Sequence, residues 1–557
     1  MPRSTITGTF SKSIEIREDG ELADARSFNL AFPDPGSTSG LPDLATPGET
    51  IRGKLVYGYT GDWDAGRTGA NNVRAQLDTG LKQDTSDGVI TFAFLNQQHV
   101  TGINNSPKLG EGAGYAPFSA AQQAAARVAI QNWDDLIAAK FVEVTPGPGA
   151  STWAQSKVDI WLANTVTGPA QAWAYYPGYG HQYQRVAGDV WIADPRANSS
   201  NGQLDPGFYG LQTLNHELGH ALGLSHPGDY NFGDDNDGDG VPDPITYEGD
   251  AFYFQDNNQY TIMSYFDSYE AGNNQIDWNL MRLVYPSTPM VDDVRVIQAK
   301  YGADFTTRSG DTTYGFNSTA DVTNAAMKFV PGEMITIFTI WDGGGNDTLD
   351  LSGYYTNSVI DLREGAYSSA GGFGAYSSSL ADSDPSQLSK ADYLAVVNPA
   401  NAALGFGARD AVYDLYFGGR AGVNEGISWF ETMGHDTLIE NNIGIAYGAI
   451  IENAVGGHGD DRINGNQANN MFTGGDGADT FIFAKYGLND VSVDTILDFH
   501  SGEDKIDLSF FTGLDAAHVQ IDNANHMVKV DTDLNGSMDM TIMVQGTDVV
   551  PTDFIFG

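Results

Sequence analysis

The residues with the clearest chemistry lie in one run, His-Glu-Leu-Gly-His-Ala-Leu-Gly-Leu-Ser-His. Residues four apart share one face of a helix, so His216 and His220 can direct two imidazoles at one metal ion. Glu217 lies one step round the helix, where it can reach a water on that ion without ligating it. Gly223 can take the left-handed backbone that ends a helix, and the chain can then return His226 as a third nitrogen ligand. Three protein ligands with one open position are typical of a catalytic zinc site.

A helix with two surface histidines would explain a lone His-Glu-x-x-His, but Gly223 and His226 at fixed offsets lower the chance match roughly a thousandfold. The run resembles the zinc motif of the metzincin metalloproteases, in which a methionine turn follows the third histidine. That turn is present here as Thr-Ile-Met-Ser-Tyr, with Met263 at its centre. The resemblance implies one catalytic Zn²⁺ on the three histidines, with Met263 as an apolar floor beneath them.

The same resemblance implies a mechanism. Zinc lowers the pKa of its bound water from about 15.7 to near 7. Glu217 takes that proton as general base and later gives it to the leaving amine. Tyr265 resembles the tyrosine that swings on and off the metal, and with zinc it would stabilise the oxyanion. The implied substrates are proteins or peptides, which the enzyme cuts internally.

Composition excludes several other classes of protein. The chain has 557 residues, enough for three or more domains, and no apolar run of membrane-spanning length. Lys and Arg number 28 against 72 Asp and Glu, a net charge of −44, which argues against nucleic acid or an anionic membrane as partner. Such an excess suits multivalent cations, although a soluble acidic surface would explain part of it. With no cysteine, a disulfide framework, a thiol nucleophile and a cysteine-held zinc are excluded.

The first fifty residues mix charge, proline and glycine with little periodicity, and they contain no cleavable secretory signal. We interpret residues 1–50 as a leader or propeptide; a disordered tail is the alternative. Because no cysteine can cap the zinc, inhibition would come from a carboxylate such as Asp34 or from steric occupation of the cleft.

The resemblance implies an α+β metzincin domain over residues 51–302, and the segments before the zinc motif are those that must position it. Ser119 caps a predicted helix that runs to Ile137 with apolar residues at helical spacing. In metzincins the edge strand before the zinc helix lies alongside the substrate, which adds to it through backbone hydrogen bonds. The predicted strands are 89–95, 141–144, 158–162, 173–178 and 189–192.

From about residue 289 the sequence resembles the serralysins, and residues 303–557 predict an all-β calcium-binding RTX domain. Residues 456–464 and 474–482 fit the pattern Gly-Gly-x-Gly-x-Asp-x-apolar-x, and 465–473 is a weaker copy. The glycines let carbonyls point inward and the aspartates add charged oxygen, both of which suit calcium. The resemblance implies a parallel β-roll with one strand per copy, followed by a closing β-sandwich. An insertion at about 373–440, to which we assign no function, interrupts the pattern.

Several structural Ca²⁺ ions are therefore expected. The resemblance to the serralysins implies calcium ligands at Arg308, Gly310, Thr312, Asp342, Gly344, Gly345, Asp347, Glu452, Gly457, Gly459, Asp461, Gly475, Gly477 and Asp479. A second acidic loop has carboxylates at Asp235, Asp237, Asp239 and Asp243, like the first part of a calcium loop, but it lacks the bidentate Glu. A solvated acidic turn is the alternative there.

The end of the chain, 553–557, resembles the acidic-then-apolar terminus of proteins exported by type I, ATP-driven secretion machinery. We therefore expect a secreted, extracellular, monomeric zinc endopeptidase, exported without an N-terminal signal peptide. One rival is a calcium-dependent adhesin or surface-layer protein with a relict protease site. The completeness of the zinc motif argues against it, because a decayed site should have lost a ligand. A zinc amidase acting on cell-wall peptide is a second rival, since the motif does not specify the acyl donor.

Overall fold

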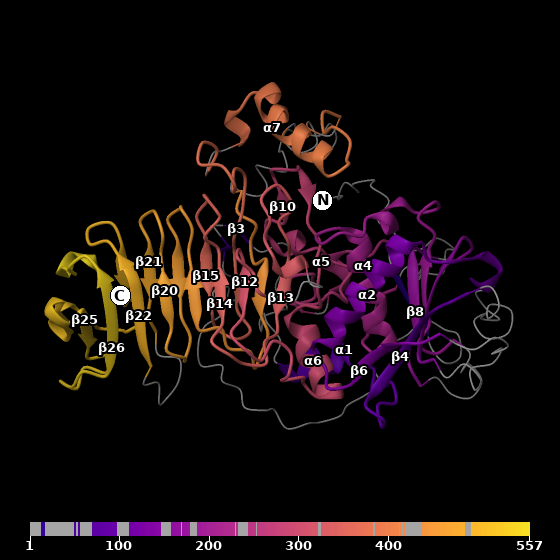
Figure 1. Ribbon diagram of the computed structural model, residues 1–557, viewed down its shortest axis with the longest axis horizontal. Helices are drawn as coiled ribbons and strands as arrows, with labels where there is room; N and C mark the ends of the chain where they lie inside the picture. The colour runs from indigo at the N-terminus through magenta and orange to yellow at the C-terminus, as the bar shows by residue number, and fades with distance from the viewer. Residues whose placement is uncertain are drawn as a thin grey trace. The chain divides into compact units, whose positions relative to one another are not determined.

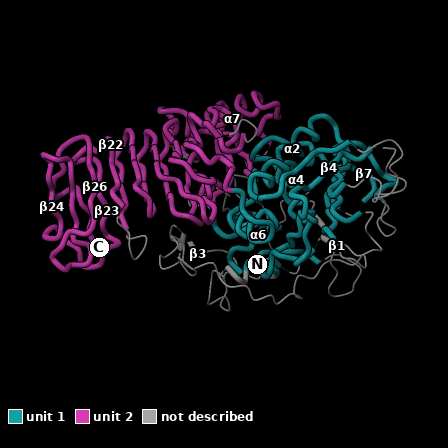
Figure 2. The backbone as a smooth tube through the Cα atoms, turned by 60° about the horizontal axis from the view of Figure 1, so that its bottom comes forward, with its two compact units in different colours: residues 1–37, 44–272, 285–304 teal, residues 38–43, 273–284, 305–557 magenta. Residues whose placement is uncertain are grey.

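The computed structural model falls into two compact units (Figure 2). Unit 1 comprises residues 1–37, 44–272 and 285–304, and unit 2 comprises 38–43, 273–284 and 305–557. The structure describes residues 13–16, 50–51, 54–55, 70–96, 111–145, 158–168, 170–178, 186–228, 230–231, 243–251, 253–320, 325–381, 385–411, 413, 417, 437–484 and 492–557. The domain boundaries expected from the sequence stay a prediction.

Unit 1 is built around one mixed sheet, of which β4, β6 and β8 are labelled in Figure 1. Its strand order is β1-β8-β9-β7-β4-β6, and β5 pairs with β7. β4, β6, β7 and β9 run parallel, whereas β8 is antiparallel to β9. The buried rings of Trp161, Trp173 and Trp191 pack on one face. All five predicted strands are confirmed, with ends shifted by a few residues. The strands are β1 (Ser13–Ile16), β4 (Val89–Phe94), β5 (Tyr115–Ala116), β6 (Lys140–Glu143), β7 (Ile160–Thr165), β8 (Ala172–Tyr175) and β9 (Val190–Ala193).

The helices of unit 1 include the predicted one after Ser119. Ser119 caps it with a reciprocal capping box to Gln122. The helix ends at Asp134, so its predicted end at Ile137 was wrong. The Asp134 carboxylate accepts the Phe141 N–H at 2.6 Å, which turns the chain into β6, and Ile137 instead bridges to Ala303. The helices are α1 (Ala70–Leu77), α2 (Ala120–Asp134), α4 (Tyr209–Ala221), α5 (Tyr247–Asp250) and α6 (Val291–Tyr301).

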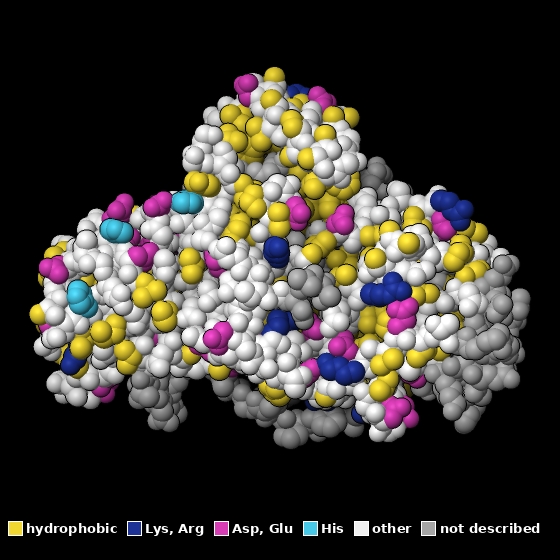
Figure 3. Space-filling view, in the orientation of Figure 1, with side chains coloured by type: hydrophobic (Ala, Val, Ile, Leu, Met, Phe, Trp, Pro, Cys, Tyr) yellow, Lys and Arg dark blue, Asp and Glu magenta, His cyan; other side chains and the backbone are white. Residues whose placement is uncertain are grey.

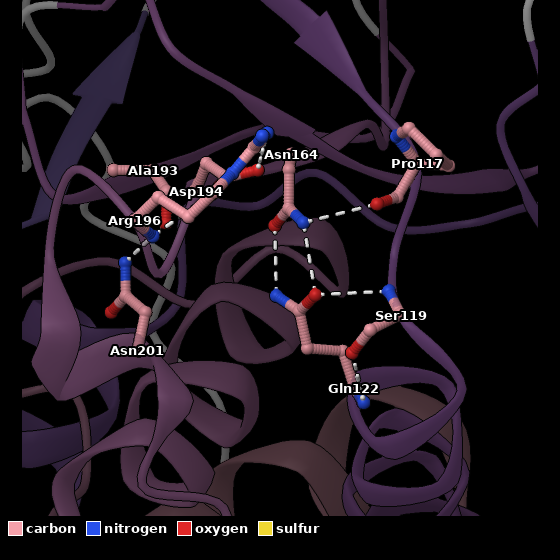
Figure 4. A network of polar contacts seen from close by, with 8 residues as sticks. All are labelled: Pro117, Ser119, Gln122, Asn164, Ala193, Asp194, Arg196 and Asn201. Carbon is pink, nitrogen blue, oxygen red and sulfur yellow. Dashed lines mark hydrogen bonds and ion pairs between the residues drawn. The ribbon is translucent and has the colours of Figure 1, made fainter.

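Buried polar contacts join α2 to the sheet (Figure 4). The side-chain amides of Gln122 and Asn164, on β7, exchange two hydrogen bonds of 2.9 Å. Gln122 also accepts the Ser119 N–H, and Asn164 donates to the Pro117 carbonyl. The amino end of α2 is thereby fixed on β7, and α2 packs against α4, the helix that carries the zinc motif.

In unit 2 the chain alternates between two sheets. The eight-stranded sheet has the order β12-β14-β18-β20-β22-β26-β25-β24, and the five-stranded one β15-β19-β21-β23-β27. β18 to β23 enter the two sheets in turn, and each pairs parallel with the next strand of its own sheet. Their central residues, among them Ile463, Phe472 and Phe481, are fully buried. Each repeat copy therefore supplies one short strand to a shared core.

These strands are β12 (Thr313–Gly315), β14 (Thr348–Asp350), β15 (Val359–Asp361), β18 (Asn453–Val455), β19 (Arg462–Asn464), β20 (Met471–Thr473), β21 (Thr480–Ile482), β22 (Val493–Phe499), β23 (Lys505–Asp507), β24 (Val519–Asp522), β25 (Met527–Val530), β26 (Met540–Gly546) and β27 (Phe554–Ile555). β13 (Phe338–Ile340), β16 (Tyr367–Ser368) and β17 (Ile443–Ile445) form a third sheet, and β10 (Ile276–Asp277) pairs with β11 (Arg282–Leu283). β2 (Thr50–Ile51) pairs with β3 (Lys54–Leu55).

The predicted insertion contains a helix that the sequence analysis missed, α7 (Lys390–Ala403), which has Pro399 inside it. Its buried side packs on the segment around β10 and β11. Tyr393 donates to the Trp278 carbonyl at 2.7 Å, and Asn401 accepts from Arg282 at 2.7 Å. These contacts join residues more than 100 positions apart in the sequence. Because local sequence does not reveal them, a helix with an internal proline was not predicted.

Acidic side chains lie both at the surface and inside. On the face drawn in Figure 3, Asp and Glu are scattered and do not gather into one patch. Many aspartates of unit 2 are instead buried, including Asp347, Asp461, Asp479 and Asp504. Among the described helices, none is both long and apolar enough to span a bilayer.

Candidate active site

The three histidines of the zinc motif meet at the end of α4. Each ring places its Nδ1 beside a backbone carbonyl: His216 by Ile262 at 2.8 Å, His220 by Leu224 at 2.8 Å and His226 by Tyr230 at 3.0 Å. Because a carbonyl only accepts hydrogen bonds, Nδ1 carries the proton in each ring, and the Nε2 lone pair is left for a metal.

The three Nε2 atoms converge on one point. The Nε2 of His226 lies 3.2 Å from that of His220 and 3.3 Å from that of His216. A tetrahedral ion with metal–nitrogen bonds of about 2.0–2.1 Å separates two of its nitrogen ligands by about 3.3 Å. The donor set and its spacing therefore fit zinc.

Burial keeps these imidazoles neutral. It lowers the pKa of His216 to about 4, and it lowers the pKa of His220 and His226 well below the usual value. Repulsion between the rings lowers the pKa of His220 and His226 further. A neutral ring is the form that ligates a metal, so at neutral pH no proton has to leave the histidines first.

The turn after α4 brings His226 back toward the helix. Gly223 has a φ of +90°, and an added Cβ would collide with the Leu81 carbonyl oxygen. Thr79 donates its hydroxyl to the Gly223 carbonyl at 2.7 Å, and Ser225 N–H donates to Leu77 at 2.8 Å. The left-handed turn expected at Gly223 is confirmed, and the chain after α1 holds it in place.

The methionine turn lies under the histidines. Met263 is fully buried, and its sulfur approaches Gly219 of α4 so closely that an added Cβ would collide with it. Trp133 of α2 lies against the same glycine and donates its indole N–H to the Asn215 carbonyl at 3.1 Å. Asn132 also bonds to Asn215, at 3.1 Å. The sequence analysis missed these asparagines, which tie α2 to the residue before His216.

Glu217 and Tyr265 are the two candidate catalytic side chains. Glu217 is fully buried on α4, next to His216 in the chain. The half-buried ring of Tyr265 lies over His226, with 4.3 Å between ring centroids, and stacks on His216 at 6.1 Å. A buried carboxylate on the same helix and a phenol thus accompany three neutral imidazoles.

The candidate calcium ligands gather in two places in unit 2. In the first, Asp347 accepts the Thr312 N–H at 2.7 Å and donates its own N–H to Glu452 at 2.7 Å. Asp342 accepts the Gly344 N–H at 2.6 Å, and Gly345 lies against Gly310. Arg308 has a φ of +47° and donates to the Trp341 carbonyl.

The second place is the repeat itself. The Asp461 carboxylate accepts N–H groups from Gly457 at 2.5 Å and Ser358 at 2.6 Å. Asp461 N–H donates to Asp479 at 2.9 Å. Gly475 packs against the Gly457 carbonyl, and Gly477 packs likewise against Gly459.

Two further aspartates continue this ladder and were missed. Asp479 N–H donates to Asp504 at 3.0 Å, and Gly475 N–H donates to Asp498 at 2.9 Å. The run Asp504-Lys505-Ile506 matches the Asp-x-apolar part of the repeat, a signal that could have identified Asp504. In the weaker copy the neutral Asn470 replaces Asp.

Carboxyl groups of both clusters have raised pKa values. Burial, followed by the neighbouring carboxylates, raises the pKa of Asp347 and Asp461 to about 7 and that of Asp479 to about 8. Close carboxylates without a cation favour protonation, so these groups suit a bound divalent ion.

Other candidates fall outside these clusters. Four of them lie outside the described residues: Asp34, Asp235, Asp237 and Asp239. Asp243 is described, but the rest of its acidic loop is not, so this calcium loop stays a prediction. Elsewhere in the described part of the chain, the carboxylates of Asp531, Asp533 and Asp539 lie together, two of them exposed.

Comparisons with known proteins show the family to which this chain is related. The family model for the Peptidase M10 serralysin C terminal matches residues 303–383 and 430–556, so residues 384–429, which contain α7, lie between the matched parts. Serralysin C of Dickeya chrysanthemi is 37% identical over 58% of this chain and 60% of its own length. Serralysin of Photorhabdus luminescens is 33% identical over 71% of this chain and 67% of its own. Metallopeptidase AprA of Pseudomonas marginalis is 35% identical over 76% of this chain and 73% of its own. With this similarity across both units, the chain belongs to the serralysin family and is a metalloendopeptidase.

Proposed function

We propose that this metalloendopeptidase uses one zinc ion, held by His216, His220 and His226, to cut polypeptides outside the cell. The observation that carries the proposal is the convergence of three neutral Nε2 atoms at 3.2–3.3 Å in the two measured pairs. The mixed sheet, the zinc helix and the methionine turn beneath it support a metzincin layout for unit 1.

The residues around the metal divide the chemistry between them. Zinc, when bound, supplies Lewis-acid polarisation of a water molecule and of the peptide carbonyl. Glu217 takes a proton from the attacking water and gives it to the leaving amine. The Tyr265 phenol donates a hydrogen bond to the oxyanion, which adds to the stabilisation of the transition state. The buried Met263 side chain, which packs against Gly219 of α4, provides an apolar surface on one side of the site.

We further propose that several calcium ions hold unit 2 as a parallel β-roll. The alternation of β18 to β23 between two sheets supports this architecture, as does the ladder of buried carboxylates from Asp461 to Asp504. Calcium ligation by inward carbonyls and aspartates would replace repulsion between these groups with attraction.

Export through a type I transporter before folding is the third part of the proposal. Asp553, in the acidic-then-apolar terminus, is fully buried and accepts hydrogen bonds from Ser501 at 2.7 Å and Gly502 at 3.1 Å. β27, which follows it, pairs with β23. A transporter could therefore reach the Asp553 carboxylate only in an unfolded chain, and folding would follow outside, where calcium is abundant.

We also propose that the N-terminal segment is an inhibitory leader. β1 (Ser13–Ile16) pairs parallel with β8, on the side of β8 opposite β9. An extended substrate that adds to this sheet next to β8 needs the same backbone groups. The leader would then exclude substrate by occupying the strand edge, without a zinc-capping cysteine.

Digestion of denatured casein by the purified, calcium-loaded chain tests the proposed activity. We expect cleavage that a zinc-selective chelator abolishes and added Zn²⁺ restores. An intact casein band with zinc bound would contradict the proposal and favour a relict site. Cleavage of cell-wall peptide but not casein would favour the amidase.

A further inference from the structure

A fully buried carboxylate lies behind the methionine turn. Asp293, in the first turn of α6, accepts the Thr261 hydroxyl at 2.6 Å, the Ile262 N–H at 2.6 Å and the Met290 N–H at 2.8 Å. Burial raises the pKa of Asp293 to about 7, while these three donated bonds lower it. All three contacts are donors, so they match the ionised form of the group.

A chain of hydrogen bonds runs from this carboxylate to a metal ligand. The Thr261 hydroxyl donates to Asp293 and accepts the Met263 N–H at 3.1 Å. That N–H belongs to the same peptide plane as the Ile262 carbonyl. The Ile262 carbonyl in turn accepts the Nδ1–H of His216 at 2.8 Å. We call this series, from Asp293 through Thr261 and the 262–263 peptide to His216, the Asp293 relay.

The relay fixes the peptide plane from two sides. Asp293 also holds the Ile262 N–H directly, so both peptide units that flank Ile262 are anchored to the same carboxylate. A peptide plane that cannot rotate keeps its carbonyl aimed at Nδ1 of His216. If the carbonyl turned away, the proton could move to Nε2, the atom that must be bare to bind a metal.

We propose that Asp293 is a positioning residue for zinc, which acts through the Asp293 relay to keep the proton of His216 on Nδ1 and its Nε2 turned to the ion. Successive hydrogen bonds of one direction polarise one another, so a carboxylate at the far end also makes the His216 ring a stronger donor to the metal. The inference rests on the proposed zinc site and adds a residue from α6 to it.

The test compares Asp293→Asn with Asp159→Asn in the full-length, calcium-loaded chain. Asp159 is the matched control: its carboxylate accepts the hydroxyl of Thr91 at 2.6 Å and the Thr91 N–H at 2.8 Å, but Thr91 lies on β4 of the sheet and not in the methionine turn. Zinc affinity is measured by competition with a chromogenic chelator. The His216 tautomer is measured in zinc-free protein by long-range ¹H–¹⁵N spectra, with the His216 signal assigned by its loss in His216→Asn.

For Asp293→Asn we expect a zinc dissociation constant about tenfold higher, the lower end of the range for groups that orient metal ligands. We also expect a mixture of the two His216 tautomers, whereas wild type and Asp159→Asn show Nδ1–H only. Wild-type zinc affinity and tautomer in Asp293→Asn would overturn the proposal, as would equal loss of zinc in Asp159→Asn. If the wild-type chain itself bound no zinc, the proposed function would fail instead.

Thr261 supplies a second, milder pair of variants in case Asp293→Asn does not fold. Thr261→Val removes the hydroxyl and breaks the relay, while Asp293 keeps both backbone donors. Thr261→Ser keeps the hydroxyl. We expect a severalfold weaker zinc affinity in Thr261→Val and near wild-type affinity in Thr261→Ser; equal affinities in the two would also overturn the proposal.

Discussion

The backbone N–H of Asp461 donates to the carboxylate of Asp479, at 2.9 Å, and the two residues stand one full turn of the repeat apart. Each of these carboxylates is buried, and each has a raised pKa. Charge that cannot be hydrated must be neutralised by a proton or by a cation. Neutralisation by protons leads to a prediction for the calcium-free chain, and neutralisation by a cation leads to a prediction for calcium addition.

Without calcium, we expect unit 2 to become less stable as pH rises. A carboxyl whose folded pKa lies above its unfolded value of 3.8 contributes stability that is present at low pH and lost as pH rises through the folded pKa. With values of about 7 for Asp461 and about 8 for Asp479, the loss spans pH 4 to 8. Urea unfolding of the full chain in chelator, followed by circular dichroism, measures this. Asp479→Asn should flatten the dependence, and an unchanged slope in that variant would contradict the assignment.

Calcium should act as a folding switch for the same unit. The apo chain has a net charge of −44, and its short glycine-rich repeats bury little apolar surface to offset their entropy cost. At about pH 8, where protons no longer fully neutralise the carboxylates of Asp461 and Asp479, we expect strand signal and protease resistance of unit 2 to appear when calcium is added to chelated Glu217→Ala protein, which cannot digest itself. Equal structure in excess chelator would refute the coupling between calcium and folding.

Glu217→Ala should retain zinc but lose peptide hydrolysis. Glu217 follows His216 on α4, and the group of side chains that could hold the metal consists of His216, His220 and His226, so we expect its removal to leave the metal site intact. Loss of general-base help costs 10²–10⁴-fold or more in turnover. Casein cleavage and zinc content, measured on the same sample, decide the question. Wild-type turnover at full zinc occupancy would show that another group is the base.

Local sequence signals sufficed for the centre of the site and for the repeats. The His216–His220 spacing, the glycine at 223 and the Gly-Gly-x-Gly-x-Asp pattern all follow from backbone geometry within a few residues. The partners that orient the histidines could not be predicted, because Ile262 and Tyr230 contribute carbonyls that carry no sequence signature. Asp293 reaches the site only through the tertiary packing of α6. Pro399 disfavours the helix α7, but the contact of Tyr393 with Trp278 stabilises it. That contact joins distant parts of the sequence, so local sequence signals do not reveal it.

Removal of the N-terminal leader should activate the enzyme. Since β1 pairs with β8, a chain that retains it would present a filled strand edge to substrate. N-terminal sequencing of active, secreted protein should find a start beyond Ile16. A fully active form that still begins at Met1 would contradict the proposal. Peptide cleavage by a variant that begins at residue 51 should then exceed that of freshly refolded full-length chain.

Gly223→Ala should lower both stability and zinc affinity. Gly80→Ala is the control that separates the strain of a left-handed alanine from the collision at the Leu81 carbonyl. Both glycines have left-handed backbones, with φ of +90° and +76°, but an added Cβ meets the Leu81 carbonyl at Gly223 and nothing within 4 Å at Gly80.

Left-handed strain alone costs an alanine about 1–2 kcal/mol, so Gly80→Ala should lose about that much stability and keep its zinc. At Gly223 the collision must move the turn that carries His226, so we expect a larger loss together with a dissociation constant for zinc at least tenfold higher. Thermal unfolding and chelator competition measure the two quantities. If both variants kept wild-type zinc affinity, the Gly223 turn would not be what positions His226.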